Sequence, residues 1–94
     1  MYLFLINVLE WMQEKARRSK KKDWKGVSEV CNKLGNLYSR AGEYELSLAE
    51  HKEELEISKK LNEDMIEVAT AHRNVGEVLS AMEEHDAAMT HLET

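Results

Sequence analysis

Apolar residues recur at steps of three or four along most of the chain, as they do on one face of an amphipathic α-helix. Successive stripes of this kind contain Val27, Val30, Cys31, Leu34, Tyr38 and Ala41, then Tyr44, Leu48, His51, Leu55 and Leu61, then Met65, Val68, Ala69, His72, Val75, Leu79 and Met82. Gly42 suits the left-handed residue that ends a helix, and Asn62 or Asp64 suits an N-cap. The pattern predicts helices over residues 2–20, 24–41, 43–60, 64–82 and from 85 onward.

The composition favours helix over sheet throughout. The 94 residues include no Pro and only four Gly, and residues with strong helix propensity are plentiful. One Cys excludes an internal disulfide and suits a reducing compartment. We therefore expect an all-α fold.

A phrase of the sequence occurs twice. "CNKLGNLY" begins at Cys31, and "HRNVGEVL" begins 41 residues later at His72. Ser47 and Ala88 each follow the Gly of their copy, Gly35 or Gly76, by twelve residues. The predicted unit is two helices joined by a tight turn, with a Gly on the first helix facing a small residue on the second. Leu at either Gly is then expected to overpack the pair.

Units of this kind bury their apolar faces only by stacking in arrays, usually of three or more. We predict a leading helix over residues 1–22, with an apolar start and a basic end, followed by two repeats over residues 23–94. The first repeat covers residues 23–61 and the second, truncated, covers 64–94. The chain is interpreted as one slice of an α-solenoid.

The repeated phrase resembles the tetratricopeptide repeat, although that repeat usually has about 34 residues. The positions that carry the likeness are Leu34, Gly35, Tyr38 and Ser47 in the first copy and Val75, Gly76 and Ala88 in the second. Longer repeats are found in polarity adaptors of the Pins type, which share features like "LGNLY" and "HKEEL" here. That resemblance implies antiparallel helix pairs that bind extended peptides, and this adaptor role is the alternative interpretation.

A narrower resemblance is to Tonsoku-like proteins. It covers about Glu14 to Thr94, and its specific part is "AHRNVGEVLSAME" at residues 71–83. It implies a nuclear scaffold that acts at stalled or damaged replication forks and supports homologous recombination. It also implies a protein partner from a repair complex, and histones bound through downstream domains that this sequence does not contain.

Tetratricopeptide geometry implies a concave groove lined by the first helix of each repeat. The partner-binding positions map to Asn32, Asn36, Ser39, Arg40, Thr70, Arg73, Asn74 and Glu77, with Glu29 and Ser80 on the same faces. Asn both donates to and accepts from a peptide backbone, and Arg pairs with a carboxylate. The alternative is an ordinary solvated surface. The acids Glu43, Glu45, Glu50, Glu53, Glu54 and Glu56 are expected mostly on the outer face of their helix.

The chain contains residue types that enzymes use, but they are not spaced as in a catalytic site. Cys31 and His72 hold the same repeat position and are expected to fill the core. The other histidines, His51, His85 and His91, lack the spacing of a metal site. With no nucleophile–base pair, metal set or phosphate loop, we expect no catalysis, no cofactor and no small-molecule substrate.

Charge is distributed unevenly. Seven of the thirteen basic residues lie between Lys15 and Lys25, and the rest of the chain is acidic. The cluster fits a nuclear import signal made of Arg17, Arg18, Lys20, Lys21 and Lys22. A plain charged surface is an alternative, and direct DNA contact is a weaker one.

The first twelve residues, "MYLFLINVLEWM", are strongly apolar. They are too short to span a membrane, and no positive charge precedes them as in a secretory signal. Membrane association and a signal remain minor alternatives. We expect a helix that another element covers.

Overall fold

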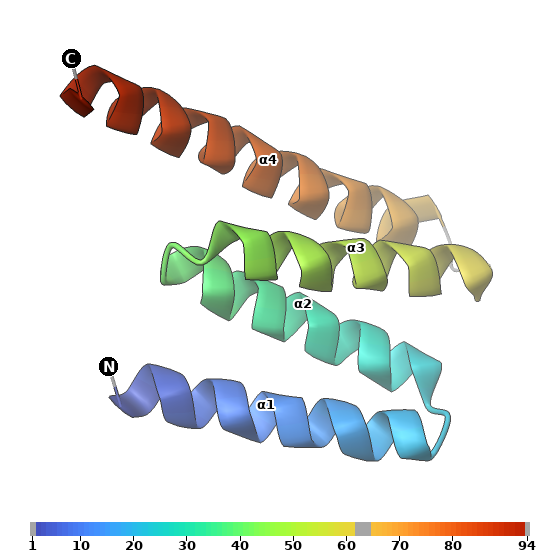
Figure 1. The fold of residues 1–94 in the computed structure, drawn as a ribbon. Helices are drawn as coiled ribbons and strands as arrows, with labels where there is room; N and C mark the ends of the chain where they lie inside the picture. The colour runs from blue at the N-terminus through green and yellow to red at the C-terminus, as the bar shows by residue number, and fades with distance from the viewer. Residues whose placement is uncertain (1, 62–64, 94) are drawn as a thin grey trace.

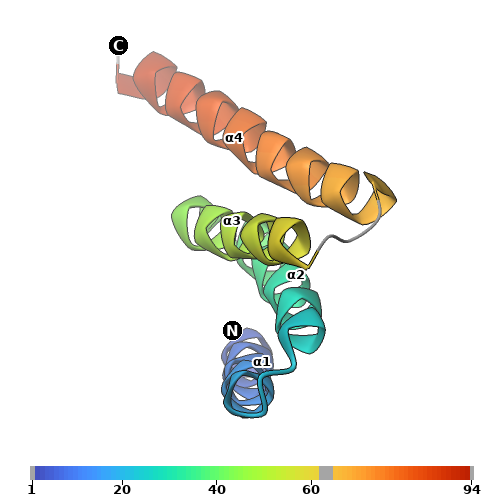
Figure 2. The same ribbon diagram turned by 90° about the vertical axis from the view of Figure 1, so that its right-hand side faces the viewer.

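The computed structural model describes residues 2–61 and 65–93, with side chains described up to residue 86. Four helices form in these ranges: α1 (Tyr2–Lys20), α2 (Trp24–Arg40), α3 (Tyr44–Lys60) and α4 (Met65–Glu93). Each packs antiparallel to the one before it, so the helices stack in chain order (Figures 1 and 2). The prediction of an all-α fold of antiparallel helix pairs is confirmed.

The short turns explain where the first three helices begin and end. Asp23 precedes α2, and its side chain accepts a hydrogen bond from the backbone N–H of Gly26 at 3.1 Å. Between α2 and α3, Gly42 adopts a φ of 78°, which L-residues with a Cβ rarely adopt. These local signals end the helices within a residue or so of the predicted positions.

Helix α1 packs against α2 through one face only. Val8, Val30 and Leu34 are buried together, and Phe4 meets Tyr38 edge-on with ring centroids 6.5 Å apart. The opposite side of α1 exposes large apolar side chains, namely Tyr2, Leu3, Leu5, Ile6, Leu9 and Met12. No helix in the described residues combines the length and apolar character that crossing a membrane requires.

An ion-pair cluster also ties α1 to α3. The ammonium of Lys15 lies 2.9 Å from a carboxylate oxygen of Glu50 and 2.8 Å from one of Glu53. Partial burial alone would lower the pKa of Lys15, but its hydrogen bonds to Glu53 and Glu50 outweigh this and raise it. Helix α1 is therefore fixed to both helices of the following hairpin.

The first copy of the repeat makes the close contact that the sequence predicts. Gly35 is buried, and its carbonyl oxygen accepts a hydrogen bond of 2.7 Å from the hydroxyl of Ser47. The imidazole of His51 covers the Cα of Gly35 so closely that an added Cβ would overlap it. Glycine is therefore required by the packing of α2 against α3.

The second copy does not make that contact. Gly76 is exposed, and a Cβ added to it would meet nothing within 4 Å. The expected close approach at Gly76 is wrong, and the side chain of Ala88 lies outside the described residues. His72, expected in the core like Cys31, is exposed, whereas Cys31 is buried.

The predicted break after residue 82 is also wrong, because α4 is continuous from Met65 to Glu93. The sequence explains this difference. Glu83 stands 41 residues after Gly42, at the matching position of the repeat. Glu is a good helix former and avoids the left-handed conformation that Gly42 adopts, so the helix continues.

Candidate functional site

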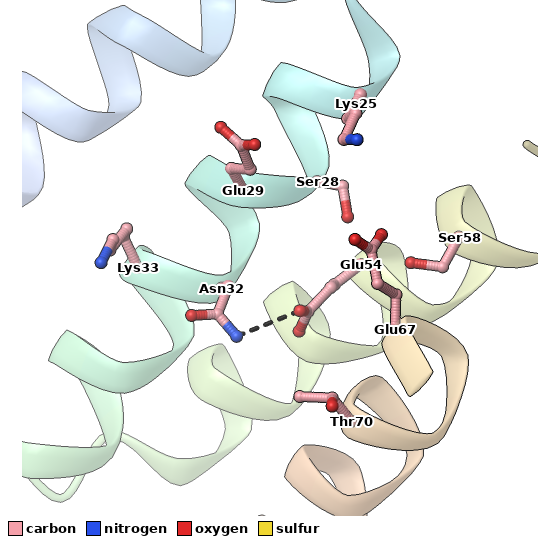
Figure 3. Close-up of a pocket in the computed structure, with 9 residues that line it drawn as sticks. All are labelled: Lys25, Ser28, Glu29, Asn32, Lys33, Glu54, Ser58, Glu67 and Thr70. Carbon is pink, nitrogen blue, oxygen red and sulfur yellow. Dashed lines mark hydrogen bonds between the residues drawn. The ribbon is translucent and has the colours of Figure 1, made fainter. Parts of the chain in front are cut away.

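A polar pocket of about 420 Å³ lies where α2, α3 and α4 converge (Figure 3). Its lining consists of Lys25, Ser28, Glu29, Asn32 and Lys33 from α2, Glu54 and Ser58 from α3, and Glu67 and Thr70 from α4. Glu29, Asn32 and Thr70 were among the groove positions mapped from the sequence. The pocket lies between the first helices of the two repeats, where the groove was expected.

Glu54 lies at the centre of a hydrogen-bond network beneath this pocket. It is 8% exposed, and it accepts from the side-chain amide of Asn32 at 3.0 Å and from that of Asn74 at 3.4 Å. The Nδ1 atom of His51 lies 3.0 Å from the same carboxylate. The network joins α2, α3 and α4, so one carboxylate helps to set the relative positions of three helices.

The sequence prediction placed Glu54 on the outer face of its helix, and this is wrong. Helix α3 is packed between α2 and α4, which buries Ser47, His51, Glu54 and Ser58 along one side. These polar residues follow one another at steps of four, three and four, the spacing of a helix face. That periodicity was the available signal, but an argument based on hydropathy alone overlooked it.

The remaining predicted groove residues have different surroundings. Asn36 is exposed, and its amide donates to the side-chain oxygen of Asn32 at 3.3 Å. Arg73 and Glu77 of α4 are both exposed and pair with each other, with Nε and Oε1 3.7 Å apart. Ser39 and Arg40 lie at the C-terminal end of α2 and do not line the pocket. Of the predicted partner-binding set, Asn32 and Thr70 thus line the pocket, Asn74 joins the network through Glu54, and the others do not line it.

Cys31 has the surroundings of a structural thiol. Its side chain is buried and donates to a carboxylate oxygen of Glu53 at 3.4 Å. Burial raises the pKa of this thiol well above its ordinary value, so the reactive thiolate is disfavoured. Cys31, Glu50 and Glu53 place three potential ligand atoms within 4.8 Å of one another. The ammonium of Lys15 already pairs with both carboxylates of this cluster, which makes it a poor fit for a metal ion.

The residues of the predicted import signal differ in their contacts. Arg17 and Arg18 both donate to the carboxylate of Glu14, and Arg18 also donates to the carbonyl oxygen of Gly26 at 3.1 Å. These hydrogen bonds lower the pKa of Glu14 to about 2. Residues 20–22 are exposed at the end of α1 and in the following turn. Of the predicted import signal, these three lysines are exposed, Arg17 is exposed but paired with Glu14, and Arg18 is partly buried.

Comparison with known proteins identifies the repeat. A family model described as tetratricopeptide repeat matches residues 28–94. Tonsoku-like protein from Mus musculus is 27% identical over 90 residues, covering 96% of this chain and 6% of the relative. The Bos taurus protein of that name is 39% identical over 64 residues (68% of this chain, 5% of the relative). The Drosophila melanogaster protein is 35% identical over 80 residues (85% and 6%).

The chain is homologous to Tonsoku-like proteins over most of its own length, but it spans only 5–6% of theirs. The mouse alignment covers 96% of the chain and so includes most of residues 1–13, which the sequence comparison had left outside the resemblance. No solved structure matches. The helix pairs, the buried glycine contact of α2 with α3 and the match over residues 28–94 agree: the chain belongs to the tetratricopeptide repeat family.

Proposed function

We propose that this chain is a non-catalytic binding unit that holds an extended segment of a partner protein in the groove between α2 and α4. The observation that carries the proposal is the polar pocket of about 420 Å³ beside these helices, which is lined by Asn32 of α2 and Thr70 of α4. Clefts of this size accommodate several atoms of a bound chain. The buried thiol of Cys31 offers no competing catalytic interpretation.

The asparagines supply the chemistry for binding a peptide backbone. The amide nitrogen of Asn32 donates to Glu54, which fixes the orientation of the side chain. Its oxygen then accepts from Asn36, which is exposed and keeps a further N–H and its own oxygen toward solvent. One side chain therefore offers both a donor and an acceptor to a passing peptide bond.

We further propose that the partner belongs to a nuclear complex that repairs replication forks and supports homologous recombination. Homology to Tonsoku-like proteins supports this role, since the resemblance described above implies it. The exposed Lys20, Lys21 and Lys22 support nuclear import. Because the chain spans 5–6% of its relatives, it would contribute one contact surface to the scaffold.

Partner binding is tested by comparing the proteins that co-purify with the tagged chain from nuclear extract. The test variant carries Asn36→Ala and Arg73→Ala, and the control carries Lys52→Ala and Glu56→Ala, on the exposed side of α3. A partner bound in the groove is lost from the first variant and kept by the second. If both variants retain the same partners while circular dichroism shows intact helices, groove binding is refuted.

The nuclear role is tested by imaging the fluorescently tagged chain after replication has been stalled. Replacing Lys20, Lys21 and Lys22 by Ala should reduce nuclear accumulation. Replacing the exposed Lys59 and Lys60 at the end of α3 should not. Equal distribution of all three forms, or absence of the wild type from stalled forks, contradicts this part of the proposal.

A further inference from the structure

We infer that α1 is an interface between two copies of this chain, whose α1 helices pack antiparallel through the apolar side that faces away from α2. This surface is separate from the pocket between α2, α3 and α4, so the inference goes beyond the proposed function. It follows from the spacing and exposure of the apolar residues of α1, from the area that they offer, and from the distribution of charge along this helix.

The exposed apolar side of α1 has the spacing of a helix that pairs with another helix. Tyr2, Leu5, Leu9, Met12 and Ala16 recur at steps of three, four, three and four, and all five are exposed. This is the spacing of the a and d positions of a heptad, which form the seam between two paired helices. The opposite face of α1 already packs against α2. A helix that is apolar on both sides is normally buried between neighbours, and the described helices cover one side only (Figures 1 and 2).

The exposed surface is large enough for a stable contact with a second copy. Six large apolar side chains of α1 are 49–85% exposed, namely Tyr2, Leu3, Leu5, Ile6, Leu9 and Met12. At about 150–200 Å² for each fully exposed side chain, together they offer on the order of 600 Å². The largest apolar patch on a typical monomer covers about 300–600 Å². Two such surfaces would bury about 1,200 Å² in total, which is the lower limit of a standard interface.

The charges of α1 favour an antiparallel pair over a parallel one. Basic residues gather toward its C-terminal end, between Lys15 and Lys25, whereas Glu10 is the one charged residue in residues 2–12. A parallel pair would place two basic ends side by side, and like charges in such contact repel. An antiparallel pair directs the two basic ends in opposite directions.

One register of the antiparallel pair matches the apolar residues of both copies. With Tyr2 opposite Met12 of the second copy, and Leu5 opposite its Leu9, the apolar halves of the two helices overlap and the basic ends project beyond them. Each helix of the chain already packs antiparallel to the one before it. The pair of α1 helices would therefore continue the same stacking from one copy into the next.

A membrane surface would also cover these side chains, but the charges of α1 fit it less well. Helices that lie on membranes carry basic residues along the polar face, where they meet anionic headgroups. Residues 2–14 of α1 contain no Lys or Arg, and their charged residues are Glu10 and Glu14. Pairing with a second copy requires no basic residues beside the apolar ones, so the composition of α1 favours it.

The test is the molar mass of the full chain in solution, measured by size-exclusion chromatography with light scattering. The wild type should form a dimer with a Kd on the order of 10 µM, at the weak end for an interface of this size. Leu5→Gln with Leu9→Gln should raise this Kd at least about tenfold. The matched control, Met65→Gln with Leu79→Gln, replaces two exposed apolar residues of α4 and should leave it unchanged. Circular dichroism verifies that both variants keep their helices.

Disulfide cross-linking tests the orientation. Chains that carry Tyr2→Cys or Met12→Cys are oxidised separately and as a mixture, while the native Cys31 is buried. In the antiparallel pair the new thiols of identical chains lie about 15 Å apart along the helix axis, because ten residues separate positions 2 and 12. A linked dimer should therefore form in the mixture and not from either variant alone.

Three results would overturn the inference: a wild type that is monomeric at roughly 100 µM, a Leu5→Gln with Leu9→Gln variant that dimerises as tightly as the wild type, or cross-linking of Tyr2→Cys chains to one another. A monomer that sediments with vesicles of phosphatidylcholine and phosphatidylserine, and loses this binding in the same double variant, would assign the exposed side of α1 to a membrane surface instead.

Discussion

Gly35 and Gly76 occupy the same place in the repeated phrase but have opposite surroundings. Gly35 is buried beneath the ring of His51, and its carbonyl oxygen accepts from Ser47. Gly76 is exposed, with nothing within 4 Å of the position of a Cβ. The two copies diverge at the turn, where Gly42 has a φ of 78° and Glu83 continues α4. A shared motif therefore becomes a contact only when the residues after it allow the chain to reverse.

The sharpest way to test this comparison is to place Leu at each glycine in turn. Gly35→Leu should lower the free energy of unfolding by about 1–3 kcal/mol or more, because the new side chain overlaps buried His51. Gly76→Leu should be neutral or raise it by up to about 1 kcal/mol, because Leu favours helix and meets open space. Urea denaturation of both variants measures the difference.

A double variant isolates the cause. The double variant Gly35→Ala with His51→Ala should lose less stability than the sum of the losses in the two single variants, since the ring that the new Cβ overlaps is gone. Equal destabilisation by Leu at Gly35 and at Gly76 would show that the two copies do not differ as described.

The first repeat also differs from the second in being fixed to α1, and Lys15→Met tests that difference. The substitution keeps the length of the side chain but leaves Glu50 and Glu53 facing each other without the ammonium. A loss of about 1–2 kcal/mol in unfolding free energy is expected, as for hydrogen bonds to charged groups that remain partly solvated. Thermal melting checks it, and Lys52→Met, at an exposed site on α3, should change little.

A smaller effect is expected at the turn itself. Gly42→Ala forces a residue with a Cβ into the left-handed region and should cost about 1 kcal/mol. Glu83→Gly should lower the helix content of α4, measured by far-ultraviolet circular dichroism, because it introduces the poor helix former found in the first copy. An unchanged spectrum for Glu83→Gly would mean that the turn residue does not control the continuity of α4.

The smallest predicted effect concerns pH and the exposed end of α1. Hydrogen bonds from Arg17 and Arg18 hold the pKa of Glu14 at about 2, below its ordinary 4.5. The ionised carboxylate therefore contributes stability above about pH 4.5, and this contribution is lost as the pH falls toward about 2. The melting temperatures of wild type and Glu14→Gln should differ slightly at neutral pH and converge near pH 2. A constant difference would contradict the assignment.

Much of the fold follows from the sequence because it is specified locally. Helix spacing, Asp23 before α2 and Gly42 after it give the first three helices almost to the residue. Repeat arithmetic also identified the contact of Gly35 with Ser47. The same arithmetic failed for Gly76, because it carried the turn of the first copy onto a position occupied by Glu83.

The pocket between α2, α3 and α4 was only partly predictable from the sequence. Family geometry mapped Glu29, Asn32 and Thr70, which line this pocket, whereas binding of a partner by these residues stays a prediction. Family geometry did not predict that Glu54 is buried at this pocket, because the burial of an acidic residue depends on the helices packed against it. The packing of α2 and α4 against α3 encloses this carboxylate, and the donors of Asn32 and Asn74 compensate for its loss of water.

The enclosed carboxylate of Glu54 has a mechanical consequence. Apolar packing holds neighbouring helices without directional bonds, whereas an acceptor with donors on both sides adds hydrogen bonds that an axial shift would break. A displacement of α4 by one turn, about 5.4 Å, would carry Asn74 out of reach and leave part of the charge unmatched. Glu54 thus sets the axial alignment of neighbouring repeats, and with it the pitch that an array built from such units would adopt.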